Sequence, residues 1–176
     1  MKIRHLFRTA LAAALLSTFA ATGAQATVPA VPSSLAPAVH ETLRLSVSAR
    51  GVQIYECRKA GDGAAWTFVA PDADLVDADG RHVGTHGAGP HWSFADGSRV
   101  TGRVKARADA PQPDAIPWLL LDAHARWPHD RLGTESSIQR VNTRGGQAPA
   151  AGCDPALVGS AARVPYSADY HFYFRR

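Results

Sequence analysis

Alternation of apolar and polar residues is the dominant pattern of this chain. It is clearest near the C-terminus, where one face of an extended strand would carry Tyr166, Ala168, Tyr170, Phe172 and Phe174. Comparable short segments recur roughly every 8–12 residues with turn residues between them, and no long amphipathic helical pattern interrupts them. The sequence therefore predicts an all-β, antiparallel domain of about eight to ten short strands, folded as a β-sandwich or a partly open barrel.

Individual strands are expected at 52–57, 66–69, 74–76, 81–83, 91–94, 98–104, 118–126, 137–141 and 166–175. Asp-Gly pairs at 79–80 and 96–97 supply the positive φ angles that tight hairpin turns require. Pro71 is expected to end the second strand, and the run 118–121, apolar on both faces, predicts a buried central strand. Residues 38–45 fit either a short helix or a strand.

The first 26 residues have the organisation of a secretory signal peptide. A basic start (1–8) precedes an apolar run (9–19) and the small-residue cleavage site Ala24-Gln25-Ala26. The apolar run is shorter than the roughly 20 residues that span a bilayer, so no stable membrane anchor is expected. We expect cleavage after Ala26 and a secreted or periplasmic protein, with a flexible arm over 27–37 and a single β domain over 38–176.

The net charge of the chain is much smaller without this leader. The leader holds three of the 19 Lys and Arg residues and none of the 15 Asp and Glu residues. The remainder is therefore nearly neutral, and its basic residues are not gathered into a cluster. A nucleic-acid-binding face requires such a cluster, so nucleic acid and anionic membrane surfaces are excluded as partners.

The two cysteines, Cys57 and Cys153, indicate one disulfide, because an even pair in an oxidising compartment is normally bridged. The bridge would close a loop of nearly the whole domain, which corresponds to roughly 4–5 kcal/mol of lost unfolded-state entropy. The alternative, a cysteine nucleophile, lacks any neighbouring group that would activate either thiol.

Candidate chemistry is concentrated between Arg81 and Gly102, where three of the eight histidines lie. The stretch from His86 to Trp92 sets an indole and two imidazoles beside a glycine loop, where the backbone can approach a ligand closely. Flat aromatic faces suit sugars and aromatic small molecules. The leading hypothesis is a non-catalytic protein that binds a small molecule or carbohydrate, or acts at a surface, without a cofactor. Its candidate ligand-binding residues are His86, Gly89, Pro90, His91 and Trp92.

The alternative hypothesis is an extracytoplasmic enzyme, either dependent on zinc or copper or hydrolytic, that uses His82, His86 and His91. Imidazole is a common ligand of both metals. In an extended strand His82 and His86 would share one face, and the glycine loop would return His91 to them. Against this, the spacing matches no established zinc signature, and the chain has no Gly-x-Ser-x-Gly elbow.

Several segments together resemble the DUF3455 family of uncharacterised secreted proteins of bacteria and fungi. They are Gly-Val-Gln-Ile-Tyr-Glu-Cys at 51–57, Val-Gly-x-His-x-Ala-Gly-Pro-x-Trp at 83–92, Asp-Gly-Ser-x-Val-x-Gly at 96–102, Ile-Pro-Trp-Leu-Leu-Leu at 116–121, and the stretches 140–149, Cys153 and 164–170. The resemblance implies that both cysteines and His86 belong to the family pattern, which favours the disulfide. At the position of His91 the family usually has a small hydroxyl residue. The family has no assigned activity, so the resemblance adds no function.

Overall fold

The computed structural model describes residues 29–125 and 136–175. The expected leader and its cleavage site lie outside these residues. Among the described residues, no helix is long and apolar enough to cross a membrane.

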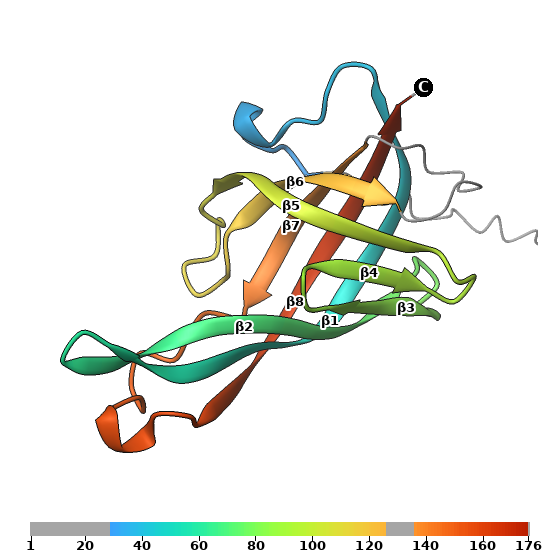
Figure 1. Ribbon diagram of the computed structural model, residues 1–176. Coiled ribbons are helices and arrows are strands. Elements are labelled where there is room, and N and C mark those ends of the chain that lie inside the picture. Colours follow the sequence, from blue (N-terminus) through green and yellow to red (C-terminus); the bar gives the residue numbers. More distant parts are fainter. Residues whose placement is uncertain (1–28, 126–135, 176) are drawn as a thin grey trace, which may run out of the picture.

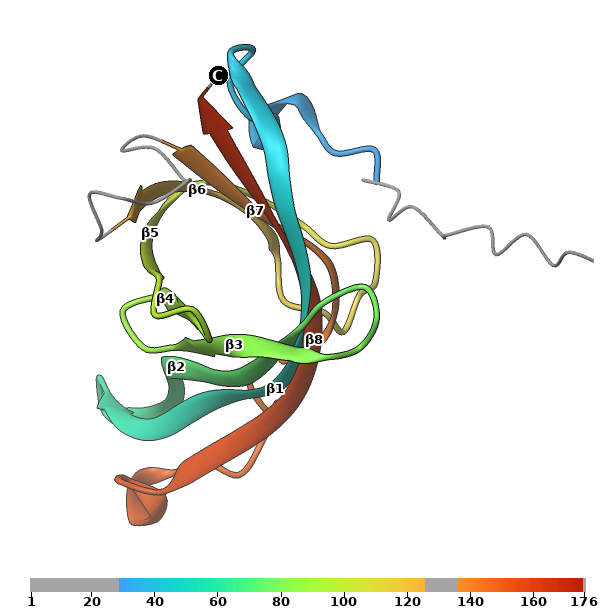
Figure 2. The same ribbon diagram turned by 90° about the vertical axis from the view of Figure 1, so that its right-hand side faces the viewer.

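Eight antiparallel strands form one closed barrel in which each strand pairs with the next and β1 pairs with β8 (Figures 1 and 2). The prediction of an all-β, antiparallel domain is confirmed, and the barrel, closed rather than partly open, is the architecture observed. The strands are β1 (Glu41–Ala60), β2 (Gly63–Val76), β3 (His82–Gly87), β4 (His91–Phe94), β5 (Arg99–Ala108), β6 (Trp118–Ala125), β7 (Ser136–Gly145) and β8 (Ala161–Arg175). Two short 3-10 helices are also described, η1 (Ser33–Leu35) and η2 (Pro155–Leu157).

The strands differ greatly in length, since β1 has 20 residues whereas β4 has four. Residues 38–45, which fitted either helix or strand, lead into and begin β1. Strand β2 does not end at Pro71, which lies opposite Gln53 within the β1–β2 pairing. Proline is tolerated at bulges and along strand edges, and both conditions hold here. A bulge interrupts the pairing next to this position, and β3 pairs with β2 only from Ala73 onward.

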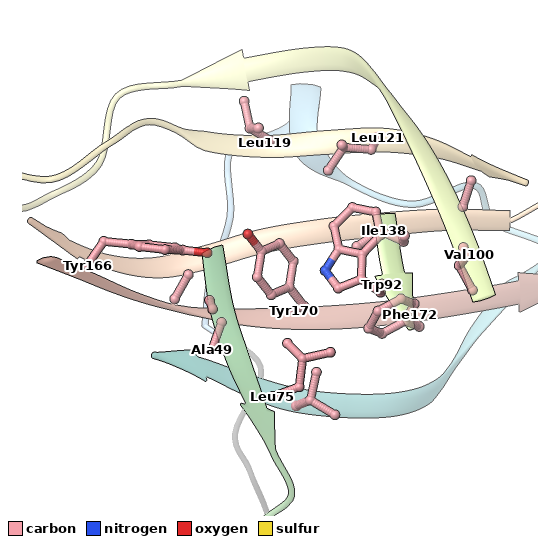
Figure 3. Packing of buried hydrophobic residues seen from close by; sticks show 14 of the residues in the cluster. Ala49, Leu75, Trp92, Val100, Leu119, Leu121, Ile138, Tyr166, Tyr170 and Phe172 are labelled. Atoms are coloured by element: carbon pink, nitrogen blue, oxygen red, sulfur yellow. The ribbon is translucent and has the colours of Figure 1, made fainter. Parts of the chain in front are cut away.

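The interior of the barrel is filled by the inward-facing residues of the strands (Figure 3). Trp92 is fully buried at its centre, with Tyr170 and Phe172 packed edge-on against the indole. Gly102 makes room for this ring, because a Cβ there would lie 2.9 Å from Trp92 Cζ3. The alternating residues at the C-terminus supply much of this core, as their pattern predicts.

A second apolar cluster lies on the outside of the barrel and holds the segment that precedes β1. It consists of Leu35, Trp118, Leu120 and Val141. Leu35, in η1, is completely buried, and its carbonyl oxygen accepts a hydrogen bond of 2.6 Å from Gln139 Nε2. We expected a flexible arm over 27–37. Its described part, from residue 29, is instead attached to the barrel wall at Leu35, because an apolar side chain there covers an apolar outer patch.

The predicted disulfide is confirmed. Cys57 and Cys153 are bonded, with their Cα atoms 5.4 Å apart and a sequence separation of 96. The bridge ties β1 to the segment between β7 and β8. Two backbone hydrogen bonds, from Cys57 N to Ser160 O and from Gly159 N to Cys57 O, hold the same segment in place. Because both thiols are consumed in the bridge, a cysteine nucleophile is ruled out.

Candidate functional site

A cavity of about 160 Å³ lies within the barrel. Every strand contributes at least one residue to its wall, together with the loop between β3 and β4. The lining is mainly apolar and consists of Gln53, Phe68, Val69, Pro71, His86, Gly89, Pro90, Trp92, Val104, Leu119, Leu121, Arg140 and Tyr170. Four of the five predicted ligand-binding residues, His86, Gly89, Pro90 and Trp92, therefore line one cavity, and His91 does not.

One wall of the cavity is an aromatic cluster carried by the β3–β4 hairpin and β8. His86 and Trp92 are cross-strand neighbours, and their rings stack with centroids 4.5 Å apart and an interplanar angle of 7°. Tyr170 meets both rings edge-on. The hairpin loop is held against β5 by a hydrogen bond from Gly102 N to Pro90 O. Gly89 has a φ of 92°, which favours glycine at this turn.

His86 is neutral and its tautomer follows from its contacts. Its Nδ1 lies 2.8 Å from the carbonyl oxygen of His91. Because a carbonyl can only accept, Nδ1 carries the proton and donates, and Nε2 is the acceptor nitrogen of the ring. Burial lowers the pKa of His86 to about 4, and the positive charge of Arg140 acts in the same direction. The ring is therefore uncharged near neutral pH.

Arg140, on β7, is the one cavity-lining side chain that is charged at neutral pH. Its Nε and Nη2 both donate to the carbonyl oxygen of Pro117, at 3.1 and 2.8 Å. Within residues 29–125 and 136–175, no ion pair joins this guanidinium to a carboxylate. The fold thus places an uncompensated positive charge beside an apolar cavity.

A buried polar cluster lies beside this charge. The Tyr166 hydroxyl interacts with Gln53 and Tyr170, and the Tyr170 hydroxyl interacts with Arg140. The buried Trp92 Nε1 has no hydrogen-bond partner among the described residues. The two tyrosine hydroxyls approach each other in Figure 3. Burial raises the pKa of Tyr166 and of Tyr170, so both hydroxyls keep their protons at neutral pH. The Arg140 guanidinium is therefore the group on this part of the wall that would meet an occupant able to accept hydrogen bonds.

The structure does not bring His82, His86 and His91 together. The bulge at Val83 sets Leu75 opposite Gly84 but Val76 opposite His82, so the expectation that His82 and His86 share a face is wrong. His82 points outward, with its Nε2 3.3 Å from Asp74 Oδ1. His91 turns back on its own loop, with Nδ1 2.7 Å from Ala88 O. Among the described residues, no three His, Cys, Asp or Glu side chains are placed to hold a metal ion.

A second set of polar side chains lies on the outer face of β1 and β8 and bears on the hydrolytic alternative. Ser46 Oγ is 2.8 Å from His171 Nδ1, which resembles a serine–histidine pair. The nearby carboxylate of Asp169 is bonded instead by Ser48 Oγ and by Asn142 Nδ2. An aspartate that orients a catalytic histidine must bond its ring, so this arrangement is a cross-strand polar network rather than a catalytic triad.

Two residues central to the cavity were not among those predicted. Arg140 lies in a segment expected to be a strand, and Gln53 lies in another. The signal for Arg140 is alternation with Ile138, which places a charge on the face that otherwise enters the core. Closure of the barrel is what sets Gln53 and Arg140 beside Tyr170, and no local pattern contains that information.

Residues 37–174 match a protein family described as a protein of unknown function, DUF3455. The match covers most of the chain, including every strand and both cysteines. No curated protein and no solved structure matches the chain.

Proposed function

The chain belongs to the DUF3455 family, and because that family has no described function, we propose one from the cavity: non-catalytic binding of a small, largely apolar molecule inside the barrel. The observation that carries this proposal is the half-open, mainly apolar cavity to which all eight strands contribute. Cavities of this kind, lined by apolar side chains with a few placed polar groups, are the usual form of small-molecule sites.

The size of the cavity limits the ligand to about one ring. An engineered apolar cavity of roughly 150 Å³ in another protein holds a benzene molecule, and the cavity here is about 160 Å³. A sugar of similar size would require hydrogen bonds to most of its hydroxyl groups. The apolar lining cannot supply them, so the proposal is a small apolar molecule rather than a carbohydrate.

Three exposed apolar side chains give the ligand a route of entry. Phe68, Val69 and Val104 line the cavity and yet are 50%, 44% and 40% exposed. Exposed apolar groups gathered at one place mark a site of interaction more often than scattered ones do. These three residues form the rim through which we propose that a ligand passes.

We also propose that the protein is exported and that its leader is removed after Ala26. The basic start, apolar run and small-residue site support this. The disulfide supports it too, since such bonds persist in oxidising compartments. Mass spectrometry of the protein recovered from the periplasm or medium should find an N-terminus at Thr27. An intact leader on the exported protein would contradict the proposal.

Toluene is a suitable probe of the cavity because it is apolar and about the size of the space. We expect it to raise the Tm of the purified protein and to shift the Trp92 indole N–H resonance. Val104→Phe should block the rim and abolish both effects. Val158→Phe is the matched control, because Val158 is 50% exposed and does not line the cavity. Absence of toluene binding to the unmodified protein, or equal loss in both variants, would overturn the proposed function.

A further inference from the structure

The charged side chain in the cavity wall indicates which class of small molecule the cavity would bind. This inference rests on the proposed function. Arg140 is the one charged lining residue, and it has no carboxylate partner among the described residues. Arg140 is half-buried, so its charge is partly shielded from water, and a carboxylate brought by a ligand would supply the counterion that the described residues lack.

The guanidinium of Arg140 is held in a defined orientation. Its Nε and Nη2 are anchored on the carbonyl oxygen of Pro117, the residue just before β6, and the side chain also interacts with the Tyr170 hydroxyl. Arg140 is also the register partner of Tyr170 across β7 and β8. The Arg140 side chain is therefore already ordered before a ligand binds, so binding does not cost the conformational entropy of ordering it.

A hydroxyl group and an indole N–H accompany Arg140 in the cavity wall. The Tyr170 hydroxyl lines the same cavity and interacts with the guanidinium itself. Trp92 also lines the cavity, and its buried Nε1 has no hydrogen-bond partner among the described residues. A guanidinium with a neighbouring hydroxyl is the complement of an anion that has several lone pairs.

We propose that the cavity binds a small monocarboxylate with an apolar body, about the size of benzoate. Its carboxylate meets Arg140 and Tyr170, and its apolar part packs against Trp92, Leu119 and Val104. A planar carboxylate with one negative charge matches the single planar guanidinium, whereas a phosphate brings nearly two charges against one. The cavity volume leaves space for about one ring beside that group.

Benzoate and benzyl alcohol have nearly the same shape but differ in charge, so comparing their affinities tests the role of the ligand's negative charge. By titration calorimetry at pH 7, benzoate should bind the purified protein about tenfold more tightly than benzyl alcohol, because charge-assisted hydrogen bonds are stronger than neutral ones. Arg140→Met should remove this preference while benzyl alcohol and toluene still bind. Arg144→Met is the matched control, since Arg144 is an exposed arginine of the same strand outside the cavity lining, and it should keep the preference.

Tyr170→Phe provides a second variant that does not depend on the folding of Arg140→Met. It removes one donor and keeps the ring, so benzoate affinity should fall several-fold and toluene affinity should not change. Equal binding of benzoate and benzyl alcohol by the unmodified protein would overturn the carboxylate inference and leave the proposed function intact. Tighter binding of phenyl phosphate than of benzoate would also overturn it. Failure of toluene as well as benzoate would overturn the proposed function itself.

Discussion

The imidazole of His86 lies parallel to the indole of Trp92, with ring centroids 4.5 Å apart. This stacking is possible in a buried core because the imidazole is neutral and its Nδ1 proton is donated to His91 O. A protonated ring would bring an unpaired charge into the barrel beside Arg140. The pair therefore forms a cavity wall whose integrity depends on the protonation state of His86.

Acid should destabilise the protein through His86. The pKa of His86 is about 4 in the folded protein and 6.5 in an unfolded chain. Between pH 4 and pH 6.5, therefore, His86 is protonated in the unfolded state and neutral in the folded state. The stabilising contribution is complete above pH 6.5 and is lost as the pH falls toward 4. For a shift of this size it amounts to about 3 kcal/mol.

Urea denaturation at pH 7.5, 6 and 5 measures this contribution against His86→Phe, which keeps a stacked ring and cannot titrate. The free energy of unfolding should fall less with acid in the variant than in the unmodified protein. His171, whose pKa is also lowered by burial, is present in both proteins and cancels in the comparison. Parallel pH profiles for the two proteins would show that His86 does not contribute.

Gly102→Ala should disturb the same wall from β5, the strand that pairs with β4. The added methyl would lie 2.9 Å from Trp92 Cζ3 and 3.1 Å from Leu121 Cδ2, so the indole must move. Overpacking of this kind costs about 1–3 kcal/mol. Chemical denaturation should record that loss, and the Trp92 indole resonance should shift. Gly63→Ala, beside the exposed β1–β2 turn, is the matched control, because Gly63 has no positive φ and the added methyl would lie 3.8 Å from its nearest neighbour, Ala60 O.

Loss of the disulfide should lower stability without dismantling the barrel. The bond closes a loop of 96 positions, for which the chain-entropy estimate is about 4–5 kcal/mol. We expect the Cys57→Ala/Cys153→Ala double variant to show a strongly reduced Tm and an unchanged far-ultraviolet circular dichroism spectrum at low temperature. A Tm equal to that of the oxidised protein would indicate that the pairing of β1 with β2 and β8 already restrains this segment.

Leu35→Ala tests whether the segment before β1 is part of the fold. The side chain is completely buried against Trp118, Leu120 and Val141, so its truncation should cost about 2–4 kcal/mol. Val39→Ala is a suitable control, because Val39 lies nearby in sequence and is fully exposed. Equal unfolding free energies for the two variants would mean that the contact of Leu35 with the barrel is not stabilising.

Local patterns were sufficient for the fold class and for grouping four of the residues that line the cavity. Period-two alternation over Tyr166–Phe174 places those residues in the core, and a turn built on Gly89 and Pro90 has the same backbone demands in any context. For this reason His86, Gly89, Pro90 and Trp92 were identified together: they lie in one hairpin, and hairpin geometry is set by neighbouring residues. The family resemblance rested on the same local segments.

Elsewhere, predictions from local patterns were wrong because they did not include bulges and long-range strand pairing. One extra residue at Val83 reverses every side chain beyond it, so His82 points to the outside and the predicted histidine cluster does not form. Pro71 lies within a strand because a bulge and an unpaired edge accommodate it. Each of these outcomes depends on which strand lies alongside.

The sequence by itself determined that the chain folds as an antiparallel β domain with one disulfide and an aromatic, glycine-rich hairpin, because these properties follow from alternation, turn chemistry and cysteine count. Only the tertiary structure decided that the strands close into a ring. That closure sets Gln53 of β1, Arg140 of β7 and Tyr170 of β8 around the space beside Trp92, and it creates the cavity. A cavity is a property of distant strands packed together, so no stretch of the sequence contains it.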